Sequence, residues 1–144
     1  MAHGKHEARL VALIDTGAPV TLFDGAMAEA VGIRLGQPGA PTENVTILGG
    51  TRRAERHMVH LTLPPFDDVS WETEVLFLRE DLNLAFAGCL GTLGFLDRWV
   101  VSFNYYDSYF VVEERDSFQG RMPKDMSQEF QRFDSEWAPP GQPG

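Results

Sequence analysis

A carboxylate on a glycine turn comes directly after an apolar run near the start of the chain. Residues 10–14 are Leu-Val-Ala-Leu-Ile, and the turn that follows is Asp15-Thr16-Gly17-Ala18. Burying such a charge costs several kcal/mol unless another group pairs with it or protonates it. The motif occurs once, so each chain supplies one carboxylate of this kind. Asp15 is therefore the first candidate for acid–base chemistry.

Other side chains that could do chemistry are less well placed. His57 and His60 are three residues apart on a predicted strand, so they point to opposite faces and would not share a metal. His3 and His6 have the same spacing at the start of the chain and would bind metal only adventitiously. Cys89, the only cysteine, lies among apolar residues, which is typical of an inert thiol. No serine has the context of a nucleophile elbow, and no metal or other cofactor is expected.

Short elements must position the turn. The apolar pattern predicts a buried strand over 8–14 and a second strand over 19–23. Asp24 can cap a short helix over 25–31, which Gly32 would end. Asp15 is therefore expected in a tight connection between two strands.

The pattern of apolar and turn residues over 44–114 is typical of further strands separated by turns. It predicts a hairpin formed by strands over 44–48 and 55–63, with residues 49–53 near its tip. An apolar stretch over 84–90 leads into Gly91. Further strands are predicted over 71–78, 99–106 and 109–114, with a single helical turn over 95–99 and a turn at Asp107-Ser108. The fold class is therefore mainly β, a closed barrel-like sheet with one or two short helices.

The two ends differ in character from this domain, which is predicted to span 8–114. Residues 1–7 are expected to be a flexible start, and residues 115–144 a C-terminal tail with four prolines. One segment of the tail, 125–137, carries four apolar side chains on one face of a predicted helix, which would dock on the domain or on a partner. These side chains are Met126, Phe130, Phe133 and Trp137.

Two segments resemble the signatures of a known family. Residues 12–23, Ala-Leu-Ile-Asp-Thr-Gly-Ala-Pro-Val-Thr-Leu-Phe, are similar to the active-site strand and turn of the retropepsins, the single-domain aspartic proteases of retroviruses and their bacterial relatives. Cys89-Leu90-Gly91 matches the second element of the family, two hydrophobic residues and a glycine. The run over 91–99 is similar to that of bacterial members.

The order of these segments adds to the resemblance. The hairpin with Gly49-Gly50 lies between the two signatures, where the family carries its flap. The resemblance covers about residues 8–114 and implies the closed β-barrel of the acid proteases. It also implies that the strand of Leu90 and Gly91 packs beside the catalytic turn.

The resemblance implies a reaction that needs two carboxylates. Two copies of Asp15 would meet across a homodimer and share a proton, because like charges so close cannot both ionise cheaply. One carboxylate acts as base toward a water, and the other, protonated, polarises the scissile carbonyl. Thr16 would hydrogen-bond to the partner turn, and Gly17 would allow the backbones to approach. Ala18, Gly49 and Gly50 would contact the peptide substrate.

Two features depart from the family pattern. Only 14 residues precede Asp15, where retropepsins generally have a further strand. The predicted flap is strongly charged, whereas family flaps are apolar and glycine-rich; its charged residues are Arg52, Arg53, Glu55 and Arg56. Two alternatives to the aspartic endopeptidase therefore stay open. One is an inactive retropepsin-fold module for binding or dimerisation, and the other is a fragment of a larger protease.

The composition and charge of the chain argue against some classes of binding partner. The formal net charge of −9 argues against nucleic acid, which needs a basic face. No segment approaches the ~18 consecutive apolar residues of a membrane span. The first residues lack the apolar core of a signal peptide, so a cytoplasmic location is expected. The expected partners are a second copy of the chain and a peptide or protein substrate.

Overall fold

The long strands β6 and β7 lie in the middle of the larger sheet of the computed structural model, which describes all residues except 48, 65, 82–84 and 122–144. β6 (Gly50–Leu63) and β7 (Phe66–Leu78) pair antiparallel along most of their length. β5 (Thr42–Ile47) pairs with the first part of β6, and its residues alternate between exposed and half-buried as a half-covered strand requires. The chain divides into two compact units, Met1–Asp97 and Arg98–Gly144.

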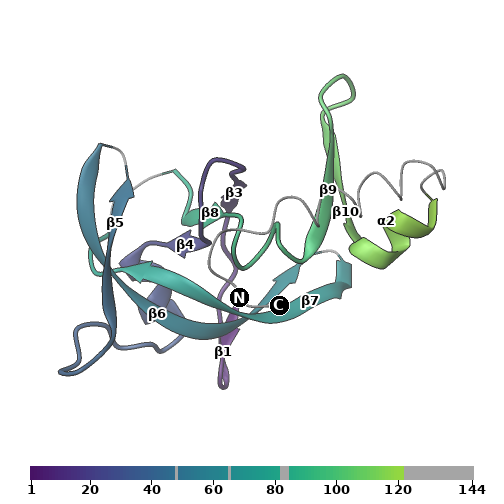
Figure 1. Ribbon diagram of the computed structural model, residues 1–144. Helices are drawn as coiled ribbons and strands as arrows, with labels where there is room; N and C mark the ends of the chain where they lie inside the picture. The colour runs from purple at the N-terminus through teal and green to yellow at the C-terminus, as the bar shows by residue number, and fades with distance from the viewer. Residues whose placement is uncertain (48, 65, 82–84, 122–144) are drawn as a thin grey trace, which may run out of the picture. The chain divides into compact units, whose positions relative to one another are not determined.

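The first unit contains one eight-stranded sheet that curls into a half-barrel (Figure 1). Its order is β2-β1-β6-β7-β4-β8-β3, with β5 on β6. β3 and β8 run parallel, and β4 lies between β8 and β7, antiparallel to the first and parallel to the second. The short strands are β1 (Ala2–His3), β2 (His6–Glu7), β3 (Ala12–Ile14), β4 (Leu22–Phe23) and β8 (Gly88–Leu90).

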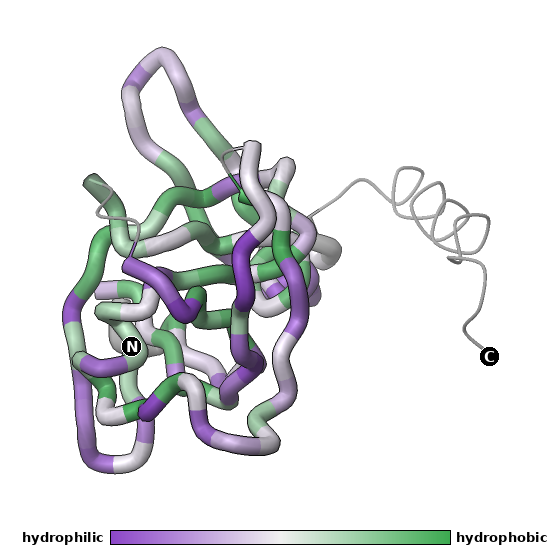
Figure 2. The backbone as a smooth tube through the Cα atoms, turned by 90° about the vertical axis from the view of Figure 1, so that its left-hand side faces the viewer, coloured by the Kyte–Doolittle hydropathy of each residue, from purple (hydrophilic) through white to green (hydrophobic). Residues whose placement is uncertain are grey.

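Apolar side chains cover both faces of β7. Leu76 and Phe77 are both fully buried although neighbouring strand residues point to opposite faces. On one face, Leu76 belongs to a buried cluster with Leu22, Ala54 and Leu78. On the other, the Phe77 ring lies 5.9 Å from that of Phe23. Figure 2 shows hydrophobic stretches of chain through this interior and hydrophilic ones at its rim.

The helix that follows the Asp15 turn and β4 begins and ends close to where the sequence predicts. α1 spans Gly25–Ala30, and the Asp24 carboxylate accepts a hydrogen bond from the Met27 N–H at 3.2 Å. Gly32 follows at a φ of +73°, a left-handed conformation that ends a helix and suits glycine. Asp24 is therefore fixed at the end of β4 by its role as N-cap.

The described part of the second unit, residues 98–121, contains a hairpin and a helix. β9 (Trp99–Asn104) and β10 (Tyr109–Glu114) pair antiparallel, and α2 (Arg115–Arg121) follows directly. The turn at Asp107-Ser108 is confirmed, with Ser108 at a φ of +57°. The helix predicted over 125–137 lies outside the described residues.

The mainly β class with few short helices is confirmed, and several details differ from expectation. Residues 1–7, expected to be flexible, form the β1–β2 hairpin, and Ala2 pairs with His60 of β6. The strand predicted over 8–14 shortens to Ala12–Ile14, because the Ala8 N–H donates to the Met1 carbonyl and closes this hairpin instead.

One further expectation changes in the later part of the chain. Residues 95–98 form turns and Trp99 begins β9, in place of the helical turn predicted over 95–99; the Gly94 N–H donates to the Asp97 carboxylate at 3.0 Å in this segment. The boundary between the two units along the chain falls between Asp97 and Arg98, within residues 8–114, which the sequence predicts as one domain.

Candidate active site

The Asp15 turn is held by its own backbone and by β8. The Asp15 N–H donates to the Leu90 carbonyl at 3.0 Å, and the Ala18 N–H donates to the Asp15 carbonyl at 3.2 Å. The Gly17 N–H donates to Oδ1 of Asp15 at 2.9 Å, which fixes the carboxylate over the turn. A Cβ at Gly17 would lie 3.3 Å from that oxygen, so a side chain here would crowd the acid.

Asp15 is exposed in the single chain, contrary to the burial that the apolar run suggested. The reason is the position of β3 at the end of the sheet order, where only β8 covers it. Val11 and Leu13 are likewise 70% and 46% exposed. The carboxylate is thus an accessible acid bordered by exposed apolar side chains.

The second signature packs against the first. Gly91 follows β8, and a Cβ there would lie 2.5 Å from the Val20 carbonyl oxygen and 2.8 Å from that of Ala18. A side chain at Gly88 would similarly collide with the Leu22 carbonyl. Glycine is therefore required at both ends of β8 for it to lie between β3 and β4. Gly88 was not identified from the sequence, because its close approach to β4 appears only in three dimensions.

Thr21 is a further residue that sequence reasoning missed. Its side chain is fully buried, and its hydroxyl accepts a hydrogen bond from the Gly91 N–H at 3.1 Å. It therefore joins the strand after the Asp15 turn to the second signature. The available signal was a hydroxyl within the apolar run of residues 20–23.

A cavity of about 260 Å³ opens beside Asp15 in the first unit. Its lining is mostly apolar and comes from β3, β4, β5, β7 and β8, so that Ile47 next to the hairpin tip and Asp15 border the same space. A second carboxylate, Asp24, also lines it. The apolar lining residues include Leu13, Leu22, Phe23, Ile47, Leu78 and Phe86.

The predicted flap is a tighter hairpin than expected. Ile47 pairs directly with Gly50, so the strand begins at Gly50 instead of resuming at residue 55. Gly49 has a φ of +74°, as such a turn requires. Gly49 therefore lies in the connection between the two strands and Gly50 begins β6, at the place where the sequence predicts the tip.

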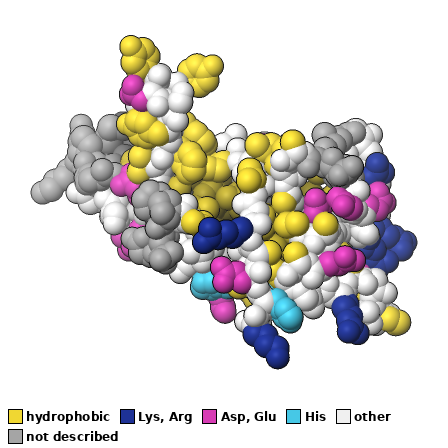
Figure 3. All heavy atoms as spheres, turned by 180° about the vertical axis from the view of Figure 1, so that it is seen from behind, with side chains coloured by type: hydrophobic (Ala, Val, Ile, Leu, Met, Phe, Trp, Pro, Cys, Tyr) yellow, Lys and Arg dark blue, Asp and Glu magenta, His cyan; other side chains and the backbone are white. Residues whose placement is uncertain are grey.

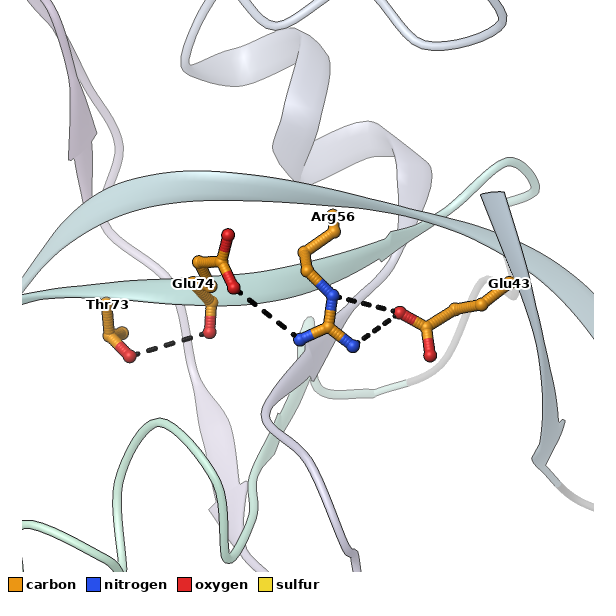
Figure 4. Close-up of polar contacts among 4 residues, drawn as sticks. All are labelled: Glu43, Arg56, Thr73 and Glu74. Carbon is orange, nitrogen blue, oxygen red and sulfur yellow. Dashed lines mark hydrogen bonds and ion pairs between the residues drawn. The ribbon is translucent and has the colours of Figure 1, made fainter. Parts of the chain in front are cut away.

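Arg52 and Arg56 near this hairpin are engaged in ion pairs. Arg56 contacts Glu43 of β5 at 2.6 Å and Glu74 of β7 at 3.7 Å, which links three strands (Figure 4). Arg52 pairs with Glu80 at 3.3 Å. These carboxylates partly neutralise the two arginines, so the hairpin would present less positive charge to a ligand than its sequence suggests.

Glu55 is not a surface charge of the flap but a buried carboxylate. Its Oε1 accepts hydrogen bonds from the Gly36 N–H at 2.7 Å and from Arg79 Nε at 2.6 Å, and its Oε2 lies 3.6 Å from His57 Nε2. Burial alone would raise its pKa, but these donors outweigh burial and hold the pKa of Glu55 below its ordinary value. Glu55 therefore ties the loop at Gly36 to β6 and to the end of β7.

Two groups that line the cavity have raised pKa values. Burial, and then the neighbouring Asp15 charge, raise the pKa of the Cys89 thiol, which makes it a poor nucleophile. Burial, with a contribution from Asp81, raises the pKa of Asp24. Among the residues that the structure describes, no cluster of three His, Cys, Asp or Glu side chains could hold a metal ion.

Within the same described part, no helix has the length and apolar character needed to cross a membrane. Comparison of the chain with protein-family models, with curated proteins and with solved structures finds no match.

Proposed function

We propose that this protein is an aspartic endopeptidase of the retropepsin type, active as a homodimer with one Asp15 from each chain. The observation that carries the proposal is the position of Asp15. It lies on a glycine turn held against β8, at the border of an apolar cavity that also touches Ile47 beside the Gly49-Gly50 hairpin tip. In the dimer, each curled sheet would form the β-barrel of one subunit.

The chemistry follows from two carboxylates at hydrogen-bonding distance. Such a pair shares one proton, so its apparent pKa values belong to the pair. The ionised member takes a proton from a bound water as that water attacks the scissile carbonyl, and the protonated member donates a hydrogen bond to the carbonyl oxygen. Collapse of the tetrahedral intermediate breaks the C–N bond. The leaving nitrogen takes a proton from the carboxyl pair, which had accepted one from the attacking water.

The surface around Asp15 is suited to contact with a second copy of the chain. One chain supplies one such carboxylate, and the exposed Val11, Leu13 and Leu93 provide apolar surface in the same unit. A self-complementary interface on a two-fold axis would bring both turns together. Thr16 is exposed and open to a partner turn, while Gly17 leaves room for it.

The second unit also exposes apolar surface that favours self-association. Tyr105 and Tyr106 at the hairpin tip are 97% and 94% exposed, and Phe103 and Phe110 are each more than half exposed. Figure 3 shows hydrophobic side chains gathered at this hairpin. Large exposed aromatic groups are typical of interaction surfaces.

Peptide cleavage at mildly acid pH tests the proposal. Asp15→Asn keeps the acceptor for the Gly17 N–H but cannot ionise, so cleavage should fall by about 10³-fold or more. The matched variant Asp107→Asn changes a carboxylate in the other unit and should cleave as the wild type does. A pepstatin-type inhibitor should block the wild type. Equal cleavage by wild type and Asp15→Asn contradicts the proposal.

The exposure of Asp15 favours one alternative, an inactive module of this fold that binds a partner. The isolated chain meets no burial cost at Asp15 and so needs no second carboxylate to be stable. That alternative predicts a monomer without peptidase activity, whose affinity for its partner is unchanged by Asp15→Ala.

A further inference from the structure

We propose that the cavity beside Asp15 binds a long basic side chain of the substrate, lysine or arginine, and that Asp24 holds its positive end. The inference rests on the proposed function and adds a substrate preference to it.

The floor of the cavity is made by three strands. Leu13 of β3 and Leu22 of β4 are both register partners of Cys89 on β8, so the three side chains point to the same face of the sheet. Asp15 follows Leu13 by two residues, and Asp24 follows Leu22 by two. Both acids are therefore on this same face, and both line the cavity.

Asp15 and Asp24 lie diagonally across β8. The Asp15 N–H bonds to the Leu90 carbonyl, and the Asp24 N–H bonds to the Ala87 carbonyl, which is three residues away along the chain. Three residues span about 10 Å, and β3 and β4 on the two sides of β8 are about 9.5 Å apart. The diagonal between the two positions is therefore about 14 Å.

This distance matches the length of a basic side chain. A scissile carbonyl would lie about 3 Å from the Asp15 carboxylate, and a positive group would lie about 3 Å from that of Asp24. Of the diagonal, about 8 Å is then left between the scissile carbonyl and the positive group. The carbonyl-to-Cα bond and the five bonds of an extended lysine side chain span about that length. A leucine side chain reaches only about half as far as lysine. The apolar Ile47, Leu78 and Phe86 suit the methylene stem.

The far end of the cavity favours a cation. Asp24 is half-buried, its Oδ1 accepts the Met27 N–H, and no lysine or arginine pairs with it among the described residues. The charge that acts on it is that of Asp81, a second carboxylate. Two arginines of the first unit are engaged with other carboxylates, Arg52 with Glu80 and Arg79 with Glu55.

Matched peptide substrates test this preference. One peptide carries lysine before the scissile bond, and the other carries norleucine, which has a linear apolar stem without the amine. The wild type should cleave the lysine peptide with a kcat/KM about 10-fold higher or more, since a hydrogen bond to a charged group is among the stronger ones. In Asp24→Asn, which keeps the N-cap, the ratio should fall to about 1. Asp107→Asn should keep the wild-type ratio.

A binding measurement separates failure of this inference from failure of the proposed function. n-Butylguanidine is titrated into ¹⁵N-labelled Asp15→Asn protein, which needs no peptidase activity. Amide shifts at Asp24, Ala87 and Cys89 that disappear in the Asp15→Asn/Asp24→Asn double variant support the inference even if no peptide is cleaved. Absence of those shifts overturns it. Cleavage with equal kcat/KM for lysine and norleucine also overturns it and leaves the endopeptidase proposal standing.

Discussion

Replacing Glu55 by glutamine should destabilise the first unit strongly. The Glu55 side chain is 0% exposed and bonds to Arg79 Nε at 2.6 Å and to the Gly36 N–H at 2.7 Å. Breaking a buried ion pair by removing one partner costs about 3–5 kcal/mol. Because the Arg79 side chain is 30% exposed, water offsets part of this cost. We expect the free energy of unfolding to fall by about 2–3 kcal/mol.

Urea unfolding at pH 7 measures this loss, and thermal unfolding should show a Tm lower by roughly 8–20 °C for a unit of this size. Glu74→Gln is the matched control, since Glu74 lies 3.7 Å from Arg56 with a side chain 56% exposed. An exposed pair contributes at most about 1 kcal/mol. The reasoning is refuted if Glu55→Gln loses no more stability than Glu74→Gln.

We expect the stability that Glu55→Gln loses to depend on pH. The pKa of Glu55 is lowered in the folded state, with burial opposing the donors that hold it down. Its contribution is therefore fully present above the unfolded pKa of about 4.3 and is lost as the pH falls through the lower folded pKa. The difference in unfolding free energy between wild type and Glu55→Gln should shrink below about pH 4. A difference that stays constant from pH 7 to pH 3 contradicts the assignment.

Two further variants test how the signatures are joined. Gly91→Ala should leave little folded protein, because its Cβ would lie 2.5 Å from the Val20 carbonyl oxygen. The control is Gly39→Ala, at a φ of +81° but in open space, which should lower the free energy of unfolding in urea by only about 1–2 kcal/mol. Thr21→Val removes the acceptor of the buried Gly91 N–H and should cost about 1–3 kcal/mol, against about 0.5 kcal/mol or less for the exposed Thr46→Val. Equal losses within either pair count against the packing described.

Features set by neighbours in sequence could be predicted, and the structure agrees with them. Asp24 caps α1 and Gly32 follows its end, because a cap needs only the residues within one turn. The hairpins at Gly49-Gly50 and Asp107-Ser108 likewise depend on local turn residues. The pairing of β3 with β8 joins distant segments, and only the family resemblance suggested it.

The environments of charged residues could not be predicted in the same way. The sequence places Glu55 in a run of charges, but its partners Gly36 and Arg79 are 19 and 24 residues away and come together only through the sheet. Asp15 follows an apolar run that suggests burial, yet β3 ends the sheet order and leaves the acid exposed. Strand order, which local sequence does not encode, decides both cases.

Mixed dimers test most directly whether two copies of Asp15 form one site. Wild type and Asp15→Asn chains are refolded together from urea in varied proportions, and peptide cleavage is measured at fixed total protein. If each site needs Asp15 from both chains, activity falls as the square of the wild-type fraction, to about one quarter in an equal mixture. Activity proportional to the wild-type fraction, about one half in that mixture, would contradict the account.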